Sequence, residues 1–144
     1  MTSMVPSKRC RLRIALLTAM LLVVVSVQGV EPANEGPVLV ALVPFEVLGE
    51  APSEVADAIS RKLLALLETD PRFGVTSATS HSAAYVIKGS VSAEPERRIA
   101  ALQLLSAKTN QIVWNENYDY TNITADMMAK DVLGALKLTA YPGR

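Results

Sequence analysis

Residues 38–43 of the chain, VLVALV, are apolar at every position, and three of the six are β-branched valines. A strand with one wet face alternates apolar and polar residues, whereas an unbroken apolar run is typical of a strand covered on both faces. The segment therefore predicts a central strand in a layered sheet. Pro44 cannot donate a ladder hydrogen bond, so regular pairing is expected to end near Pro44 and Phe45.

A helix is predicted to follow this strand. Ser53 is a good N-cap residue, and Glu54 and Asp57 place negative charge in the first turn, where the helix dipole favours it. The apolar residues that follow recur at helical spacing along one face: Val55, Ile59, Leu63, Leu66 and Leu67. The helix is expected to end at Asp70, because a residue before proline resists the helical backbone region.

Three further strands are predicted, joined by short loops. Residues 73–77 form a short candidate, residues 84–92 a longer one in which Gly89 leaves a gap on one face, and residues 98–107 a third. The apolar side of the second strand consists of Tyr85, Ile87 and Val91. The buried side of the third stays open, because Ala100, Leu102 and Leu104 compete with Ile99, Ala101 and Leu105. Turns are expected at residues 94–96 and at residues 108–111, where Asn110 suits a left-handed backbone.

The stretch IVWNENYDY, residues 112–120, is the densest aromatic and polar cluster in the chain. Alternation places four large side chains on one face, interrupted by Glu116: Ile112, Trp114, Tyr118 and Tyr120. This pattern is typical of an antiparallel strand with one wet face. Thr124 is then expected to cap a helix with Asp126 in its first turn, ending before Pro142. The apolar side of that helix comprises Met128, Val132, Leu133 and Leu136.

The sequence therefore predicts a single α+β domain over residues 38–144. We expect a mostly antiparallel sheet of about four or five strands with both helices on one face. The expected element order is β-α-β-β-β-β-α.

The first thirty residues have a different character. Four basic residues at positions 8–13 precede an apolar run, Ile14 to Val27, which ends in the small-residue exit Val27-Gln28-Gly29. This order predicts a signal peptide over residues 1–29 that is cleaved after Gly29, followed by a flexible leader over residues 30–37. The apolar run is short for a membrane-spanning helix, yet the alternative is an uncleaved anchor in the inner membrane. Either way the domain is exported, to the periplasm or beyond.

Removal of the signal segment changes the charge balance and the cysteine count. The whole chain has 14 Lys and Arg and 14 Asp and Glu, and the segment carries four of the bases and none of the acids. The remaining net charge of −4 makes nucleic acid a poor partner, because phosphates are held by clustered Lys and Arg. The one cysteine, Cys10, lies in the same segment, so no disulfide or thiol nucleophile is expected in the mature chain.

Three short motifs resemble a group of bacterial envelope modules. They are Val40-Ala-Leu-Val-Pro-Phe45, Tyr85-Val-Ile-Lys-Gly-Ser-Val91, and Ala107-Lys-Thr-Asn-Gln-Ile-Val-Trp114 with Tyr118-Asp119 following. Together they resemble the amino-terminal domain of TolB and the related modules of CsgG, FlgO and LpoB. The resemblance implies an exported, non-catalytic module that docks onto another envelope protein, without a cofactor. In relatives the last motif usually has an acid where Ser106 stands and a glycine where Asn110 stands.

One departure from this group concerns the segment between the candidate strands at residues 73–77 and 84–92. Relatives usually place a further helix there, whereas this chain has only residues 77–84, enough for a loop or about two helical turns. If that helix supplies the partner surface in relatives, the partner does not transfer. The identity of the partner and the oligomeric state stay open.

Candidate sites are few. His81 is the sole histidine, so a zinc site built from several imidazoles is not expected, and a solvated loop residue is the simpler interpretation. Asn122-Ile-Thr124 fits a glycosylation acceptor pattern, but the same residues end a strand and cap a helix. We expect no catalytic, metal or cofactor-binding residues.

The possible interaction patch is Trp114, Tyr118 and Tyr120, and core packing is the simpler role for these residues. The leading hypothesis is an accessory or scaffold module without chemistry of its own. The alternative is a soluble ligand-binding protein whose pocket is lined by Trp114, Tyr118 and Tyr85, where Gly89 leaves room. An enzyme is the third choice.

Overall fold

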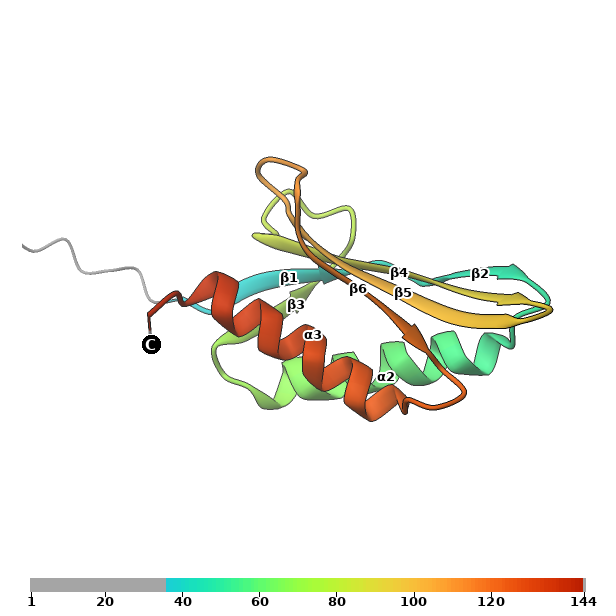
Figure 1. Ribbon diagram of the computed structural model, residues 1–144. Coiled ribbons are helices and arrows are strands. Elements are labelled where there is room, and N and C mark those ends of the chain that lie inside the picture. Colours follow the sequence, from blue (N-terminus) through green and yellow to red (C-terminus); the bar gives the residue numbers. More distant parts are fainter. Residues whose placement is uncertain (1–35, 144) are drawn as a thin grey trace, which may run out of the picture. The chain divides into compact units, whose positions relative to one another are not determined.

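The computed structural model describes residues 36–143. The predicted signal peptide and most of the predicted leader lie outside the described residues. Within them the chain forms a six-stranded sheet and two helices (Figure 1). The elements are β1 (Val38–Leu42), β2 (Glu46–Gly49), α2 (Ser53–Thr69), β3 (Phe73–Thr76), β4 (Tyr85–Glu94), β5 (Arg97–Ser106), β6 (Ile112–Asp119) and α3 (Ala125–Ala140).

The sheet has the strand order β3-β1-β4-β5-β6, with β2 also paired to β4. β1 lies between β3 and β4, which confirms the central position predicted from its unbroken apolar sequence. Val40 and Ala41 are both fully buried although successive strand residues point to opposite faces. Both faces of β1 are therefore covered at this point.

The prediction of a mostly antiparallel sheet is wrong, because the sheet is mixed. β1 pairs in parallel with both β3 and β4, and β2 pairs in parallel with β4. Only β4, β5 and β6 form the predicted antiparallel meander. The reason lies in the connection between β1 and β3. The helix α2 carries the chain back to the end of the sheet at which β1 begins, so β3 runs in the same direction as β1. A helical crossover of this kind joins parallel strands.

The strand β2 was missed by the sequence analysis. Pro44 does interrupt the ladder, as expected, but pairing resumes two residues later. β4 is long enough to hold both partners: Leu42 pairs with Ile87, and Glu46 pairs with Ser90. All four residues of β2 are exposed, so their sequence need not alternate between apolar and polar residues as that of a half-buried strand does.

Both helices lie on the same face of the sheet, as predicted, and they pack against each other (Figure 1). They also begin at the same end of the domain. Ile59, Leu63 and Leu67 from α2 are at most 1% exposed, and the predicted apolar side of α3 is buried as well. Neither helix of the described part is long and apolar enough to cross a membrane.

The core between sheet and helices settles the open question about β5. Ala100, Leu102 and Leu104 are fully buried, so the even-numbered face of β5 faces the helices. Burial of the Leu102 and Leu104 side chains contributes roughly 1.5–3 kcal/mol each to stability. The core is thus built from α2, α3 and the inner face of β1, β4 and β5.

Local predictions about turns and caps had mixed outcomes. Asn110 has a φ of 55°, which confirms its left-handed role, and Thr124 caps α3 by accepting a hydrogen bond from the amide of Met127 at 3.3 Å. Ser53, by contrast, is the first residue of α2 rather than its cap. The cap position falls on Pro52, which provides no side-chain hydrogen bond. Residues 77–84 form turns and no helix.

Candidate interaction surface

The aromatic residues of β6, an edge strand of the sheet, contribute mainly to the core. Tyr118 is only 6% exposed, and Trp114 and Tyr120 are half-buried and packed against the core cluster. Of the two interpretations offered by the sequence, core packing therefore describes Tyr118, while Trp114 and Tyr120 expose only part of their surface.

Tyr118 is also held by a polar contact with α3. Its hydroxyl donates to Oδ2 of Asp131 at 3.1 Å. Burial, and then the neighbouring Asp131 carboxylate, raise the pKa of Tyr118 well above its ordinary value. The hydroxyl is thus a protonated donor that fixes β6 to α3.

A register irregularity changes the start of β6. Trp114 pairs with Leu104, but Ile112 pairs with Leu105, so one extra residue is accommodated between them. Ile112 was expected to share a face with Trp114, and this expectation is wrong, because Leu104 and Leu105 alternate to opposite faces. Ile112 and Val113 are 52% and 42% exposed and form a small apolar strip at the edge of the sheet.

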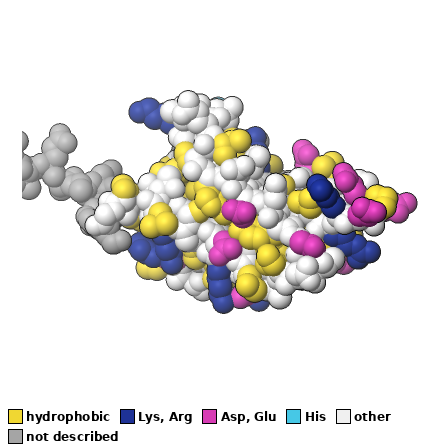
Figure 2. Space-filling view, viewed as in Figure 1, with side chains coloured by type: hydrophobic (Ala, Val, Ile, Leu, Met, Phe, Trp, Pro, Cys, Tyr) yellow, Lys and Arg dark blue, Asp and Glu magenta, His cyan; other side chains and the backbone are white. Residues whose placement is uncertain are grey.

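A pocket of about 340 Å³ lies where both helices begin, and we call it the N-terminal hollow. Its walls come from the first turns of α2 and α3 and from the β6–α3 loop. Most of its wall is apolar: Val55, Ala58, Tyr120, Ile123, Ala125 and Met128. Figure 2 shows hydrophobic side chains between acidic ones on this side of the molecule, and acidic and basic side chains gathered at the end where α2 begins.

The hydroxyl of Tyr120, which lines this hollow, is the one buried side-chain oxygen or nitrogen of the described residues without a hydrogen-bond partner. A buried polar group left unpaired costs about 1–3 kcal/mol, so such groups are uncommon in folded proteins. One residue that lines the hollow, Tyr120, thus has a buried hydroxyl that the fold itself leaves unsatisfied.

Carboxylates outnumber ammonium groups around the hollow. Glu54 lines it and takes part in none of the four ion pairs between described residues. Asp119 accepts hydrogen bonds from Thr121, another lining residue, and this contact lowers the pKa of Asp119. A third carboxylate, Asp126, is matched by two ammonium groups and is described next.

Asp126 lies in the first turn of α3. The ammonium group of Lys130 lies 2.7 Å from one carboxylate oxygen, and that of Lys62 lies 4.0 Å from the other. Lys130 is the main cause of a lowered Asp126 pKa. Both lysines near the hollow are thus already paired, whereas Glu54 is not.

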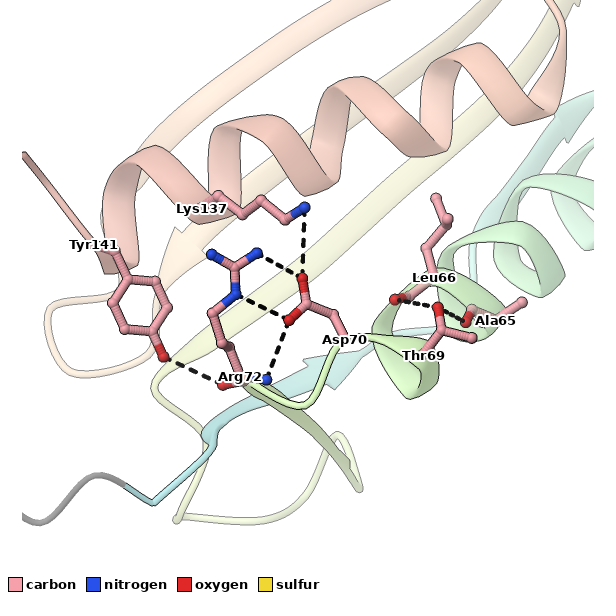
Figure 3. Close-up of polar contacts among 7 residues, drawn as sticks. All are labelled: Ala65, Leu66, Thr69, Asp70, Arg72, Lys137 and Tyr141. Atoms are coloured by element: carbon pink, nitrogen blue, oxygen red, sulfur yellow. Dashed lines mark hydrogen bonds and ion pairs between the residues drawn. The ribbon is translucent and has the colours of Figure 1, made fainter. Parts of the chain in front are cut away.

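The opposite end of the helix pair has a dense polar network, shown in Figure 3. Asp70, which follows α2, accepts two hydrogen bonds from the Arg72 guanidinium at 3.0 and 2.8 Å and a third from the Arg72 amide at 3.1 Å. Lys137 of α3 adds an ion pair at 3.4 Å. Tyr141, just beyond α3, donates to the Arg72 carbonyl at 3.3 Å. We call these four residues the C-terminal clasp.

The clasp is a structural device. The Arg72 side chain is the first cause of an Asp70 pKa far below its ordinary value of 3.8. The carboxylate therefore stays ionised and joins the α2–β3 turn to the last turn of α3. Each of the four side chains in this network has a partner within the chain.

Of the remaining candidates from the sequence, His81 lies away from both ends of the helix pair, whereas Asn122 and Thr124 line the N-terminal hollow. His81 is exposed in the β3–β4 loop. Asn122 donates from its amide to Asp119 at 3.2 Å, and Thr124 is engaged as the cap of α3, so both residues of the glycosylation pattern have local structural roles. The part of the chain that the structure describes contains no cluster of three or more His, Cys, Asp or Glu side chains suited to a metal ion.

The space that Gly89 leaves for a side chain is filled by the protein itself, and a pocket of about 220 Å³ that includes Gly89 is lined by none of Trp114, Tyr118 and Tyr85. A Cβ atom at Gly89 would lie 2.9 Å from Leu102 and 3.1 Å from the ring of Phe45, so these side chains occupy the space. Tyr118 is buried, and the Tyr85 hydroxyl donates to the carbonyl of Thr139 at 3.4 Å. These residues pack the core at this point.

Comparison with known proteins finds no matching family model and no curated relative. Solved structures do share the fold. TolB from Acinetobacter baumannii matches with a TM-score of 0.50 at 16% identity, over 75% of this chain and 29% of the TolB chain. A PelC dodecamer from Paraburkholderia phytofirmans matches with a TM-score of 0.50 at 17% identity, over 74% of this chain and 92% of PelC.

A third structure, XCC0632 from Xanthomonas campestris, has a TM-score of 0.50 at 9% identity, over 76% of this chain and 90% of its own. The chain spans less than a third of the TolB chain that it matches. These likenesses confirm the resemblance to TolB at the level of the fold.

The sequence analysis missed the N-terminal hollow. Its members come from the starts of two helices and from one loop, and no spacing rule connects positions 54–58 with positions 120–128. The one available signal was that Glu54 and Asp126 both follow a predicted helix start. Knowledge that the two helices begin at the same end was needed to bring them together.

Proposed function

We propose that this protein is an exported accessory or scaffold module of the bacterial envelope that binds another protein and performs no chemistry of its own. The observation that carries the proposal is the N-terminal hollow, an apolar pocket with an unsatisfied hydroxyl and an unpaired carboxylate at its rim. Apolar pockets with a few polar groups are the usual form of binding sites.

The shifted pKa values support a role without catalysis. The groups concerned are Asp70, Arg72, Asp119, Asp126 and Tyr118. Burial is the main cause of the raised pKa of Tyr118, and the other shifts are explained by local contacts that stabilise a turn or a helix end. Catalytic sites, by contrast, bring such groups together around a substrate.

The fold supports placement in the envelope. TolB and PelC share the architecture, and the predicted signal peptide would export the domain across the inner membrane. Mass spectrometry of the chain isolated from the periplasmic and the membrane fractions tests this part: a first residue at Val30 supports cleavage after Gly29, and an intact amino terminus in the membrane fraction supports an anchored form.

Site-specific photocrosslinking in the bacterial envelope tests the binding role. A photoreactive residue is placed at exposed positions distributed over the domain, among them Thr121, Val113 and Ser82. A scaffold should yield one defined protein adduct from neighbouring positions and none from distant ones. If no position yields a protein adduct, while a small molecule from cell extract quenches Trp114 fluorescence saturably, the ligand-binding alternative replaces the proposal.

A further inference from the structure

We infer that the N-terminal hollow receives an apolar side chain of a protein partner, presented between basic residues. The inference rests on the proposed function, since it specifies the surface and the chemistry by which the partner is recognised. Three features of the hollow support it: the apolar wall, the charge at the rim and the Tyr120 hydroxyl.

The wall requires an apolar occupant. Val55 and Ala58 from α2 lie across from Ile123 and Met128 at the start of α3, and the volume of about 340 Å³ has room for large side chains. Met128 is 1% exposed and belongs to the core, so the floor of the hollow is continuous with the packed interior. Well-packed, desolvated pockets of this kind hold the anchor residues that dominate protein interfaces.

The rim favours basic neighbours for that anchor. Glu54 takes part in no ion pair between described residues, while Asp119 accepts hydrogen bonds from neutral donors of its own loop and is also close enough to Arg98 for that charge to lower its pKa. Lys62 and Lys130 are both engaged with Asp126. A partner with Lys or Arg on either side of an apolar residue would complement this negative rim, and charge complementarity of this kind selects partners and speeds their encounter.

The Tyr120 hydroxyl supplies a third feature. It is buried without a partner in the free chain, and its residue lines the hollow. A change of the Tyr120 side-chain rotamer would turn this hydroxyl toward a main-chain carbonyl of the docked segment, which would accept the hydrogen bond. The unsatisfied group then has a role in the bound state that it lacks in the free one.

Peptide binding to the purified full chain tests the inference. The probes are acetylated hexapeptide amides, KKLLKK, EELLEE and KKGGKK, and the readout is the methyl resonances of Met128 and Ile123. We expect KKLLKK to shift these resonances saturably, and each of the other two peptides to bind at least ten-fold more weakly. Equal binding of KKLLKK and EELLEE, shifts spread over the whole surface, or no shift at millimolar peptide would overturn the inference.

Two matched variants locate the contact. Glu54→Lys should weaken KKLLKK binding at least five-fold, whereas Glu68→Lys, an exposed change at the other end of α2, should leave it within two-fold. Tyr120→Phe should weaken binding of the same peptide without weakening the fold. Equal effects of the two glutamate changes would mean that general surface charge, and not the hollow, holds the peptide.

The photocrosslinking positions separate this inference from the proposed function. A protein adduct at Thr121, which lines the hollow, supports the inference if it is lost in Glu54→Lys and kept in Glu68→Lys. An adduct at Val113 or Ser82 with none at Thr121 would leave the proposed function standing and overturn the hollow as its site. The absence of adducts at every position tested over the domain would contradict both.

Discussion

The two ends of the helix pair differ in how completely their polar groups are satisfied. At the C-terminal clasp, Asp70 receives three hydrogen bonds from Arg72 and an ion pair from Lys137, and Tyr141 donates to the adjacent main chain. At the N-terminal hollow, Glu54 is unpaired and the Tyr120 hydroxyl has no partner within the chain. Both ends are made of the same two helices, so the difference is one of local chemistry.

This difference separates stability from recognition. A network of paired charges at the surface holds elements in place, because each charged side chain already has a partner of opposite charge. An apolar pocket with unsatisfied groups lowers the stability of the free chain and is tolerated where it serves binding. The clasp is therefore expected to respond to mutation by loss of stability, and the hollow by loss of binding.

The largest effect is expected from Asp70→Ala. Removal of this acceptor leaves Arg72 and Lys137 without their shared partner and should lower the free energy of unfolding by about 1–2 kcal/mol. Urea unfolding followed by the fluorescence of Trp114 measures it. Asp126→Ala, which removes a more exposed ion pair, is the control and should cost less. Equal losses would mean that the clasp is no stronger than an ordinary surface pair.

A pH profile should show the same contribution. The pKa of Asp70 is lower in the folded chain than its ordinary value of 3.8, so its stabilisation is fully present above about pH 4 and is lost as the pH falls below that. Asp119 and Asp126 shift in the same direction and add to the loss. Urea midpoints between pH 7 and pH 2 should therefore fall less steeply in Asp70→Asn than in the unmodified chain. Parallel profiles would mean that Asp70 does not contribute to the pH dependence of stability.

The residues at the starts of the two helices should differ in how much they contribute to stability, by less than the clasp and the surface ion pair do. Thr124 caps α3, so Thr124→Ala should lower the free energy of unfolding by about 1 kcal/mol. Ser53 was predicted to cap α2 but is its first residue, so Ser53→Ala should change stability by less than about 0.5 kcal/mol. Thermal unfolding by circular dichroism distinguishes the two, and a similar loss in both would restore the cap role of Ser53.

Features of the fold that depend on residues close together in the sequence could be predicted from it. The apolar sides of α2 and α3, the cap at Thr124 and the left-handed Asn110 follow from residues a few positions apart, and all are present. Short-range spacing carries these features because helix and turn geometry repeats over a few residues. The central position of β1 was equally readable, because a strand covered on both faces has no polar alternation.

The features that were missed depend on contacts between distant segments. All four residues of β2 are exposed, and β2 is a strand because the part of β4 that extends beyond β1 provides its pairing partner. Parallel pairing of β1 with β3 and β4 depends on where α2 returns the chain. The hollow requires residues near position 55 to meet residues near position 123, which no pattern in one sequence specifies.

Tyr118 in β6 and Tyr120 just after it should respond to the loss of their hydroxyl groups with small effects of opposite sign. Tyr118→Phe removes a hydrogen bond to Asp131 and should lower the free energy of unfolding by about 1 kcal/mol. Tyr120→Phe removes a buried hydroxyl without a partner and should raise it by about 0.5–1 kcal/mol. Urea unfolding of both variants under identical conditions gives the comparison. A loss in Tyr120→Phe would show that its hydroxyl is already satisfied in the free chain, and the hollow would then resemble the clasp in having no polar group left for a partner.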